Sequence, residues 1–439
     1  MPVRTLGPLC REVEIERMVP GGRGLARDAD GVLFCTGALP GERALVHLVA
    51  RRGGARHATV VDILRPSPER TAPDCPLHAR PGQAGCGGCD LLDASAAMQR
   101  EIKIGIVRDA LVRVGRLPGT ILDAALRVLD APGAEDDCGR RRARFVIDPD
   151  GQPTFSQRDG PKRVPVRACP ALHPLLARAL ADLPPLSPGG ELRLACDDRG
   201  HVAAAWTTSP RALADAQRLL SSGAVQGVVV VDGDVDVATF GDPLLHGEVA
   251  PGLRAGPLLS DAATFTQANR FGSLAILRRV LEACGEVRGR SVLELFAGAG
   301  HLTLPLWEAG ALRVDAVEGD GRAVRFLEQN IARAQATVGC SARRAFIDER
   351  LALADVDIVV ADPPRTGIPG FARLLERMAA PVLVLVSCDP ATGARDVAAA
   401  LRAGFSLDWL RPIDAFARTH HVEWVARLTR PGARPAGPV

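Results

Sequence analysis

Tyrosine is absent from the 439 residues, and aromatic side chains make up only 4% of them. Surfaces that bind single-stranded nucleic acid by stacking its bases present several aromatic rings together. With so few rings available, any contact between this chain and a nucleic acid is expected to depend on cations along the phosphate backbone.

Long hydrophobic runs are also missing. The first residues, MPVRTLGPLCREVEIERM, contain no apolar core of the length that a signal peptide needs, and no uninterrupted apolar run elsewhere is long enough to span a bilayer. A membrane-spanning helix needs about 20 consecutive apolar residues. We therefore expect a soluble, cytoplasmic protein with no membrane partner.

Neither sign of charge is in large excess, because 54 basic residues meet 51 acidic ones and leave a formal charge of +3. The total therefore does not demand a polyanionic partner, and only local clusters of arginine can indicate one. The densest cluster of the middle region lies in CGRRRARFVID, at Arg140, Arg141, Arg142 and Arg144. The length exceeds what one hydrophobic core usually supports, so two or three domains are expected in what we take to be a monomer.

Three regions differ in the pattern of their apolar residues. Residues 1–66 alternate short apolar strands with Gly and Pro turns, which is typical of a small β-barrel. Residues 67–250 open with a proline-broken linker, show helical spacing over 91–114 and contain the strand-like run GVVVVDGDVDVATF. Residues 251–439 repeat strand, loop and helix, which indicates a parallel, doubly wound sheet. The predicted class is α/β: a Rossmann-like domain after an OB-like barrel and a mixed α+β middle domain.

The run VLELFAGAGHLTLPL carries an apolar strand into Gly298 and Gly300 and then into a helical pattern. Glycines at this point let the backbone approach a cofactor closely, but a dinucleotide fingerprint needs a further glycine that residues 301–303 do not supply. The next strand ends at Glu318, where a carboxylate can accept hydrogen bonds from both hydroxyls of a ribose. A nucleoside without a pyrophosphate fits both features. S-adenosylmethionine (SAM) is such a nucleoside, and ELFAGAG resembles the first motif of the class I methyltransferases.

Two further strands end in polar residues that parallel topology brings to the same edge. VADPPRTG places Asp362 before two prolines, which form a rigid rim, and LVSCDPATGARD places Cys388 at the tip of an apolar strand. Cys388 can be a packing residue, a metal ligand or a nucleophile. A nucleophilic thiolate needs a lowered pKa, and the expected start of a helix after Cys388 offers donors for it.

A thiolate in this crevice has a definite use in methyl transfer to the carbon of a pyrimidine. C5 of uracil is a poor nucleophile until a thiolate adds to C6, and a base must afterwards remove the C5 proton so that the thiol can leave. FARTHHVEWVARL supplies candidate bases in Glu423, His420 and His421 at the start of an expected final strand.

Together these segments resemble the RNA uracil-5-methyltransferases closely. SCDPATGARD is similar to that family's SCNPxTxxRD signature, THHVE to its C-terminal signature, TFTQANR to FxQxN, and DPPRTG to its fourth-strand motif. The resemblance implies that Cys388 is the nucleophile and Glu423 the proton-abstracting base. It also implies SAM or base contacts from Gln267, Phe296, Glu318 and Asp362, with Asp348 as the further acidic contact between the last two.

Two positions depart from the family pattern. Asp389 stands where asparagine is common, and we expect it to keep the hydrogen-bonding geometry while adding a charge. His301 stands where asparagine often follows the glycine loop, which puts that one cofactor contact in doubt.

Eleven cysteines without an export signal make a disulfide framework unlikely and favour metal or catalytic roles. CPLHARPGQAGCGGC contains Cys75, Cys86 and Cys89, and VRACPALHP adds Cys169. A CxxC pair with a third cysteine nearby and a fourth at a distance matches a tetrahedral thiolate site for zinc or for an iron–sulfur cluster, and the spacing does not choose between them. Resemblance to the cluster-bearing branch of the family implies a [4Fe-4S] cluster, with Cys75 the least secure ligand.

The N-terminal strands resemble a TRAM domain, an oligonucleotide-binding barrel found on RNA-modifying enzymes. Its expected backbone contacts are arginines, namely Arg23, Arg27, Arg51, Arg52 and Arg56. The resemblance favours 23S rRNA as the partner and leaves tRNA open. A target uridine must leave its stack to reach Cys388.

Three rival readings remain. An RNA cytosine-5-methyltransferase uses the same thiolate chemistry, although the THHVE ending favours uracil. A base N-methyltransferase explains DPPR but leaves Cys388 without a purpose. A non-catalytic RNA-binding cluster protein would leave the intact cofactor and nucleophile motifs unexplained.

Overall fold

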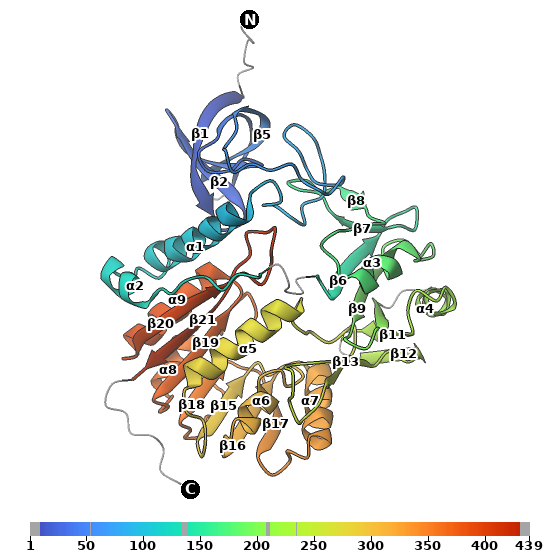
Figure 1. Cartoon of the computed structure of the whole chain (residues 1–439), viewed down its shortest axis with the longest axis vertical. Coiled ribbons are helices and arrows are strands. Elements are labelled where there is room, and N and C mark those ends of the chain that lie inside the picture. The colour runs from blue at the N-terminus through green and yellow to red at the C-terminus, as the bar shows by residue number, and fades with distance from the viewer. Residues whose placement is uncertain (1–8, 53, 134–138, 208–210, 234, 431–439) are drawn as a thin grey trace, which may run out of the picture. The chain divides into compact units, whose positions relative to one another are not determined.

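The computed structural model describes residues 9–52, 54–133, 139–207, 211–233 and 235–430, with the side chains of residues 50–52 excepted. The chain divides into two compact units (Figure 1). Unit 1 comprises Met1–Ala110, Thr154–Val166 and Phe416–His421, and unit 2 comprises Leu111–Pro153, Arg167–Ala415 and Val422–Val439. Both units therefore draw on segments that are far apart in the sequence, and the three-domain division at residues 66 and 250 stays a prediction.

Unit 1 begins with the expected barrel. Its strands are β1 (Cys10–Val19), β2 (Arg23–Asp28), β3 (Gly31–Thr36), β4 (Arg43–Arg52) and β5 (Ala55–Arg65), and they close in the order β1-β2-β3-β5-β4. Inward residues such as Val13, Ile15, Leu33 and Val60 fill the interior. Alternation of buried and exposed side chains along the strands is the physical basis of the barrel prediction, which is confirmed.

The rest of unit 1 contains the cysteine-bearing segment, most of helix α1 (Ala96–Arg113) and the β7 (Pro153–Ser156) and β8 (Arg163–Pro165) pair. The helix predicted over residues 91–114 begins later because Oγ of Ser95 accepts a hydrogen bond from the backbone N of Met98, 3.1 Å away. A serine in this place caps the helix and fixes its first turn.

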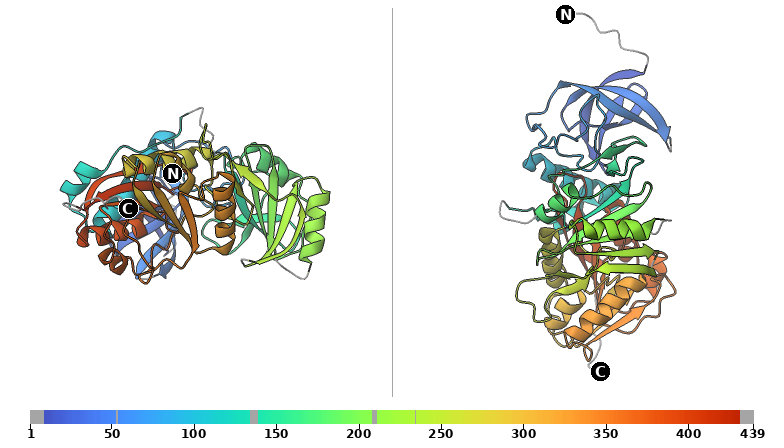
Figure 2. Two further views of the ribbon diagram at one scale, coloured as in Figure 1. Left: turned by 90° about the horizontal axis from the view of Figure 1, so that it is seen from below. Right: turned by 90° about the vertical axis from the view of Figure 1, so that its right-hand side faces the viewer.

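One sheet of unit 2 carries the strand order β12-β11-β10-β9-β6, with α3 (Pro174–Ala181) and α4 (Ala212–Ser221) packed against it (green in Figure 2). The strands are β6 (Arg142–Ile147), β9 (Glu191–Cys196), β10 (Val202–Thr207), β11 (Gly227–Asp232) and β12 (Val235–Gly241). The antiparallel pairing of β11 with β12 confirms the paired strands expected in GVVVVDGDVDVATF. Helix α2 (Gly119–Ala125) and the short pair β13 (Leu245–Gly247) and β14 (Leu258–Ser260) complete this part.

The second sheet of unit 2 is the expected doubly wound one, with strand order β17-β16-β15-β18-β19-β21-β20. Its strands are β15 (Ser291–Leu295), β16 (Arg313–Glu318), β17 (Cys340–Arg344), β18 (Ile358–Ala361), β19 (Val382–Ser387), β20 (Ser406–Ile413) and β21 (Glu423–Thr429). The helices are α5 (Arg270–Cys284), α6 (Thr303–Glu308), α7 (Gly321–Arg333), α8 (Phe371–Glu376) and α9 (Pro390–Arg402). Strands β15 to β19 are parallel, so their carboxyl ends share one edge.

Strand β21 runs antiparallel to β19. Its first residue, Glu423, therefore lies at the edge where β19 ends, and the expected final strand is confirmed. Burial of whole strands such as VLVLVS explains why these segments read as continuous apolar runs rather than as alternating ones.

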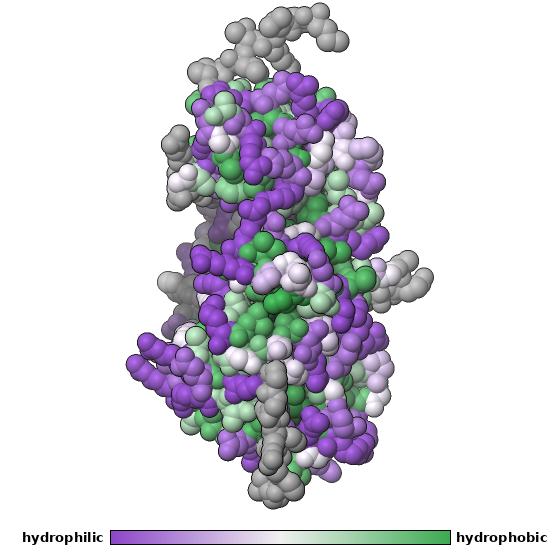
Figure 3. All heavy atoms as spheres, turned by 90° about the vertical axis from the view of Figure 1, so that its left-hand side faces the viewer, coloured by the Kyte–Doolittle hydropathy of each residue, from purple (hydrophilic) through white to green (hydrophobic). Residues whose placement is uncertain are grey.

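One face of the molecule is hydrophilic over much of its area, with hydrophobic side chains gathered near the middle (Figure 3). Among the helices of the described ranges, none is both long and apolar enough to cross a membrane.

Candidate active site

A cavity of about 530 Å³ opens at the carboxyl edge of the doubly wound sheet. Most residues that the sequence singles out for cofactor binding and catalysis line it, namely Gln267, Phe296, Gly298, His301, Glu318, Asp362, Cys388 and Glu423. All of them belong to unit 2. Parallel topology thus gathers side chains from four strand ends and two loops into one crevice, as expected.

The glycine loop turns sharply where β15 ends. Phe296 has a φ of 65°, Gly298 of 57° and Gly300 of 102°, all in the left-handed region. A Cβ on Gly300 would lie 3.0 Å from Cδ1 of Leu327, so a side chain there would press on α7. Glycine is needed at this position because both the conformation and the space exclude larger residues.

Glu318 is held rigidly by backbone donors. Its Oε2 accepts a hydrogen bond from the N of Gly298 at 2.9 Å, and its Oε1 accepts from the N of Gly319 at 2.6 Å and of Asp320 at 2.8 Å. This carboxylate therefore links the glycine loop to the start of α7 and faces the cavity with a fixed orientation. That geometry suits acceptance of hydrogen bonds from a ribose.

His301 occupies a half-buried position beside the loop. Its Nε2 lies 3.4 Å from Oγ of Ser273 on α5, and burial lowers the pKa of the imidazole to about 4. The ring is therefore neutral at physiological pH and offers one donor and one acceptor, as an asparagine side chain does. The departure from the family pattern keeps a polar, uncharged group at this place.

Three carboxyl groups line the cavity, of which Glu294 and Glu423 are buried and Asp362 is half-buried. Burial raises the pKa of Asp362 to about 7 and that of Glu423 to about 8, where the charge of Asp362 adds to the effect on Glu423 and that of Arg365 opposes it. Burial also raises the pKa of Glu294 to about 8, although Oγ1 of Thr303 donates a hydrogen bond to it at 2.6 Å. Carboxyls with a pKa near neutrality suit proton transfer.

The Cys388 thiol lies at the end of β19 beside the first residue of β21, because Ser387 pairs with Trp424 in the sheet. Burial, followed by the charges of Glu423 and Asp362, raises the pKa of this thiol to about 12, and Arg365 opposes the shift. The sequence argument asks for a lowered pKa, and the surroundings of Cys388 shift it in the opposite direction. The thiol is therefore protonated at rest, and its proton must leave when the sulfur reacts.

Asp389 caps the helix that follows the thiol. Its Oδ1 accepts a hydrogen bond from the N of Thr392 at 2.8 Å, at the first turn of α9. An asparagine oxygen makes the same bond, so the substitution keeps the geometry, as expected, and adds a negative charge at the helix N-terminus.

The TFTQANR segment forms one wall of the cavity. Gln267 lines it, and Asn269 caps α5 by accepting a hydrogen bond from the N of Gly272 at 2.8 Å. Phe265, which the sequence argument did not single out, also lines the cavity while 72% of its side chain is exposed. An exposed aromatic ring beside a polar cavity is a suitable surface for a base to stack on.

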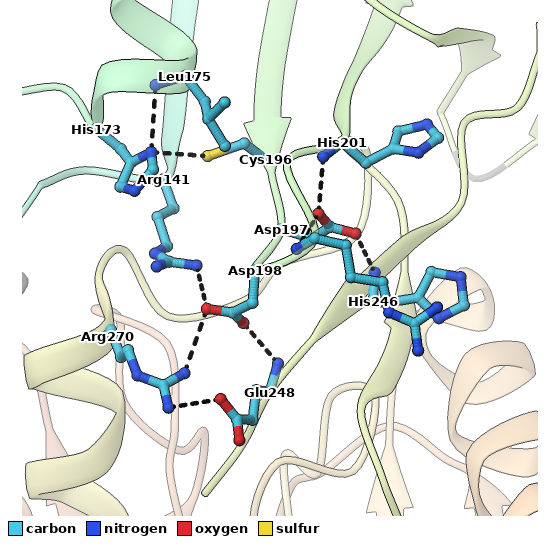
Figure 4. A network of polar contacts seen from close by, with 11 residues as sticks. Arg141, His173, Leu175, Cys196, Asp197, Asp198, His201, His246, Glu248 and Arg270 are labelled. Atoms are coloured by element: carbon cyan, nitrogen blue, oxygen red, sulfur yellow. Dashed lines mark hydrogen bonds and ion pairs between the residues drawn. The ribbon is translucent and has the colours of Figure 1, made fainter. Parts of the chain in front are cut away.

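A network of four charged residues also lines the cavity (Figure 4). Oδ1 of Asp198 lies 2.6 Å from Nη1 of Arg141 and 3.3 Å from Nη1 of Arg270. Nη2 of Arg270 lies 2.6 Å from Oε2 of Glu248. Only Arg141 was noticed in the sequence, as part of a basic cluster. Asp198 and Glu248 come from loops and Arg270 from the start of α5, and no sequence spacing links them.

The remaining arginines that we expected to contact RNA are mostly engaged inside the chain. Arg142 donates to Oγ1 of Thr266 at 2.8 Å, Arg144 lies 3.2 Å from Glu191, and Arg27 pairs with Glu16. Arg56 donates two hydrogen bonds to Asp28, at 2.5 and 2.6 Å. Contacts of Arg23, which is half-buried, and of Arg140 with RNA stay predictions, and the side chains of Arg51 and Arg52 lie outside the described part of the chain.

Asp348 does not line the cavity. It lies in the loop after β17, where its Oδ1 accepts a hydrogen bond from the N of Arg350 at 2.8 Å. Strand β17, CSARR, lacks the apolar run that marks its neighbours, so the end of this strand was difficult to place from sequence. Its role as a cofactor contact stays a prediction.

The four predicted metal ligands are divided between the units. Cys75, Cys86 and Cys89 belong to unit 1 and Cys169 to unit 2. Across the described ranges, no group of three or more His, Cys, Asp or Glu side chains is placed to hold a metal ion. Locally the N of Gly88 donates to Sγ of Cys86 at 3.4 Å, which suits a thiolate ligand. The turn before it is tight, because a Cβ on Gly85 would lie 2.5 Å from the N of Ala79.

Comparisons with known proteins identify relatives over most of the chain. A family described as conserved hypothetical protein 95 matches residues 276–385. The 23S rRNA (uracil(1939)-C(5))-methyltransferase of Halomonas elongata is 33% identical over 96% of this chain and 90% of its own length. An uncharacterized RNA methyltransferase of Rhizobium meliloti is 30% identical over 95% of this chain and 99% of its own.

A solved structure has the same fold. It is the tRNA (uracil-54, C5)-methyltransferase of Pyrococcus abyssi in complex with S-adenosyl-L-homocysteine, with a TM-score of 0.72 and 21% identity. The match covers 95% of this chain and 99% of that one. The predicted architecture, a class I methyltransferase domain with an N-terminal barrel, is confirmed.

Proposed function

The chain belongs to the family of SAM-dependent RNA uracil-C5-methyltransferases, and on this premise we propose that it methylates C5 of a uridine in 23S ribosomal RNA. The observation that carries the proposal is the gathering of the glycine loop, Glu318, Asp362, Cys388 and Glu423 around one cavity. The names of its relatives favour rRNA, and we propose that the protein acts as a cytoplasmic monomer.

The residues at the ends of β15 and β16 are suited to hold SAM. The left-handed loop through Gly298 leaves its backbone open to a ligand, and the fixed carboxylate of Glu318 is placed for the ribose hydroxyls. Bound SAM supplies an electrophilic methyl group. His301, neutral and next to the loop, adds a polar contact without adding a charge that would repel the sulfonium.

Cys388 activates the target base. Its sulfur forms a bond to C6 of uracil, which turns C5 into a nucleophilic enolate carbon that takes the methyl group. Because the pKa of the thiol is raised to about 12, its proton must be taken as the S–C6 bond forms. Asp362, a carboxyl whose charge acts on the thiol, is the acceptor that we assign to this proton, which leaves Glu423 free to take the later C5 proton.

Glu423 completes the reaction. Its carboxylate removes the proton from methylated C5, the C–H electron pair forms the C5=C6 double bond, and the S–C6 bond breaks to release the Cys388 thiolate. A pKa of about 8 makes Glu423 a stronger base than an exposed glutamate when it is ionised. The net products are 5-methyluridine, S-adenosylhomocysteine and one proton.

The uridine reaches the cavity after leaving its stack. Phe265 is the exposed ring at the cavity that can stack on the extruded base or on its neighbour. Base flipping costs a few kcal/mol, and stacking on an aromatic side chain returns about 1–3 kcal/mol. The ring thus offsets part of the cost of extrusion.

We further propose that Cys75, Cys86, Cys89 and Cys169 hold a [4Fe-4S] cluster, with zinc as the alternative. The N–H···S bond from Gly88 to Cys86 supports a thiolate at that position, because such donors stabilise sulfur in its charged form. Iron, sulfide and zinc analysis of anaerobically purified protein distinguishes the two. Stoichiometric zinc without iron would overturn the cluster.

The test of the proposed reaction is incubation with SAM and 23S rRNA that carries 5-fluorouridine. Fluorine at C5 prevents the final elimination, so a denaturant-stable protein–RNA adduct should accumulate and map to Cys388. Cys388→Ala should form none, and Arg17→Ala serves as a matched control because Arg17 pairs with Asp109 at 2.7 Å outside the cavity. Adduct formation by Cys388→Ala would contradict the mechanism.

A further inference from the structure

The segment Phe416–His421 belongs to unit 1, although the residues on both sides of it belong to unit 2. It precedes Glu423, the proposed base, by one intervening residue, Val422. Arg418, near its middle, has a φ of 70°, which a residue with a side chain adopts only when its surroundings hold it there. What holds this segment also determines how the chain enters β21.

Its backbone is fixed by α1 and by the residues just after the cysteines. The buried ammonium of Lys103 donates to O of Phe416 at 2.8 Å, and Oε1 of Gln99 accepts from N of Arg418 at 2.8 Å. The N of Leu91 donates to O of Arg418 at 3.0 Å. A buried lysine that bonds a backbone carbonyl is costly to disturb, since its charge would lose a hydrogen-bond acceptor.

His420 is fixed by the residue that follows Cys89. Oδ1 of Asp90 accepts a hydrogen bond from the N of His420 at 3.0 Å, and Oδ2 of the same carboxylate accepts one from Nδ1 of the ring. A Cβ on Gly22 would overlap the carboxylate of Asp90, so the turn between β1 and β2 closes directly over this pair. Asp90 thus binds both the backbone and the side chain of His420.

Hydrogen bonds and burial also fix the residues between His420 and Glu423. Oγ1 of Thr419 donates to O of Phe416 at 2.9 Å and accepts from N of His421 at 3.2 Å, and Val422 is fully buried. Glu423 is the first residue of β21 and pairs with Ile413 of β20, so the sheet and this segment together order its backbone. The direction in which the Glu423 side chain enters the cavity therefore depends on both.

We propose that Asp90 and His420 are positioning residues for proton removal by Glu423, and that the cysteine-bearing loop sets the geometry of the catalytic base through them. The inference rests on the proposed function and deepens it. It separates the two halves of the reaction: addition of Cys388 uses the thiol at the end of β19 and Asp362 as acceptor of its proton, whereas elimination depends on Glu423 and on the segment that leads to it.

The affected step is the last one. Glu423 takes the C5 proton, that C–H pair forms the C5=C6 bond, and the Cys388 sulfur leaves C6 as a thiolate. A misplaced carboxylate slows this step without slowing formation of the S–C6 bond. The methylated adduct on ordinary uridine RNA should then persist, whereas it resolves when the Glu423 carboxylate is in place.

The experiment follows the lifetime of the adduct with unmodified 23S rRNA and SAM under denaturing electrophoresis. His420→Ala is expected to lengthen the lifetime at least about 10-fold, in the direction of Glu423→Gln, while its rate of adduct formation with 5-fluorouridine RNA stays within about 2-fold of wild type. That second rate also shows that the variant is folded. The side-chain amide of His420→Asn keeps a donor where Nδ1 of histidine lies, so this variant should restore a short adduct lifetime. His420→Gln does not place its amide there and should leave the lifetime long.

Arg17→Ala is the matched control, because it breaks a 2.7 Å ion pair of unit 1 that does not touch the segment. An unchanged lifetime in His420→Ala, with Glu423→Gln trapping the adduct, would overturn the inference alone. Equal slowing by Arg17→Ala would also overturn it, because the effect would then be general. If wild-type protein forms no adduct with 5-fluorouridine RNA, the proposed function fails and the inference fails with it.

Discussion

In unit 1 the buried carboxylate of Asp93 lies 2.7 Å from Nε2 of His78 and 3.0 Å from Nη1 of Arg70. Burial alone would raise its pKa, but these hydrogen bonds and charges outweigh burial and lower it. At the sheet edge of unit 2, the half-buried Asp362 and the buried Glu423 have no ion-pair partner among the described residues, and their pKa values rise to about 7 and 8.

The contrast shows that a carboxyl group inside the protein can have two different roles, which depend on whether it has a cation or donor as partner. Where a cation or donor is built beside it, the group is ionised at all physiological pH values and ties segments together, as Asp28 and Arg56 do in the barrel. Where the partner is missing, the group sits near its titration point and can accept or give a proton. The first arrangement stabilises the fold, and the second prepares a reaction at some cost to stability.

The largest effect is expected from removing the thiol that these carboxyls surround. Cys388→Ala should lower the methylation rate by at least about 10⁴-fold, because the ring is no longer activated, while the midpoint of thermal unfolding changes little. Methyl incorporation from labelled SAM measures the first quantity and calorimetry the second. Residual activity within about 10-fold of wild type would remove Cys388 from the mechanism.

A pH profile sharpens the role of the unpaired carboxyls. Glu423 acts as a base only when ionised, so the single-turnover rate of adduct resolution should fall about 10-fold per pH unit below its pKa of about 8 and level off above it. Rapid quenching at a series of pH values on both sides of that pKa measures this rate. A rate independent of pH across the series would show that Glu423 does not limit resolution.

A paired carboxylate should contribute stability at neutral pH that is lost in acid. Asp93→Asn removes the carboxylate that faces His78 and one of the two that face Arg70, which keeps Glu42, and should cost about 3 kcal/mol of stability at neutral pH. Because the folded-state pKa of Asp93 is lowered from 3.8, this contribution is present above that value and is lost as the pH falls through the folded pKa. Urea titrations at neutral and acidic pH measure it, and a cost that grows on acidification would contradict the assignment.

A further expected effect is a gain in stability. Glu294→Gln keeps an oxygen that accepts from Thr303 and removes a buried charge. The pKa of Glu294 is raised from 4.5 to about 8, so wild-type stability is complete below 4.5 and falls as pH rises through that window, by up to about 1.4 kcal/mol per unit. Without SAM, the variant should match wild type in acid and exceed it in alkali. Equal melting temperatures at every pH would contradict the raised pKa.

Much of the active site could be predicted because topology does the gathering. Phe296, Asp362 and Cys388 each follow an apolar run, and the carboxyl ends of parallel strands meet at one edge whatever the details of packing. Glu423 joined them because β21 is antiparallel, which the sequence pattern does not reveal, and the family resemblance supplied that residue.

The rest depends on contacts that local sequence does not encode. The raised pKa of Cys388 comes from burial and from two carboxylates on other strands, so a helix start beside the thiol pointed in the wrong direction. Asp198, Glu248 and Arg270 meet across loops far apart in the chain. Asp90 and His420 lie 330 residues apart, and no spacing rule connects them.

Release of tritium from RNA labelled at C5 of uridine tests the central claim most directly. In wild-type protein the account predicts one tritium released for each methyl group transferred, no release by Cys388→Ala, and methyl transfer with tritium retained on a protein-bound adduct in Glu423→Gln. Methyl transfer by wild-type protein with the tritium still in the RNA, or tritium release by Cys388→Ala, would contradict it.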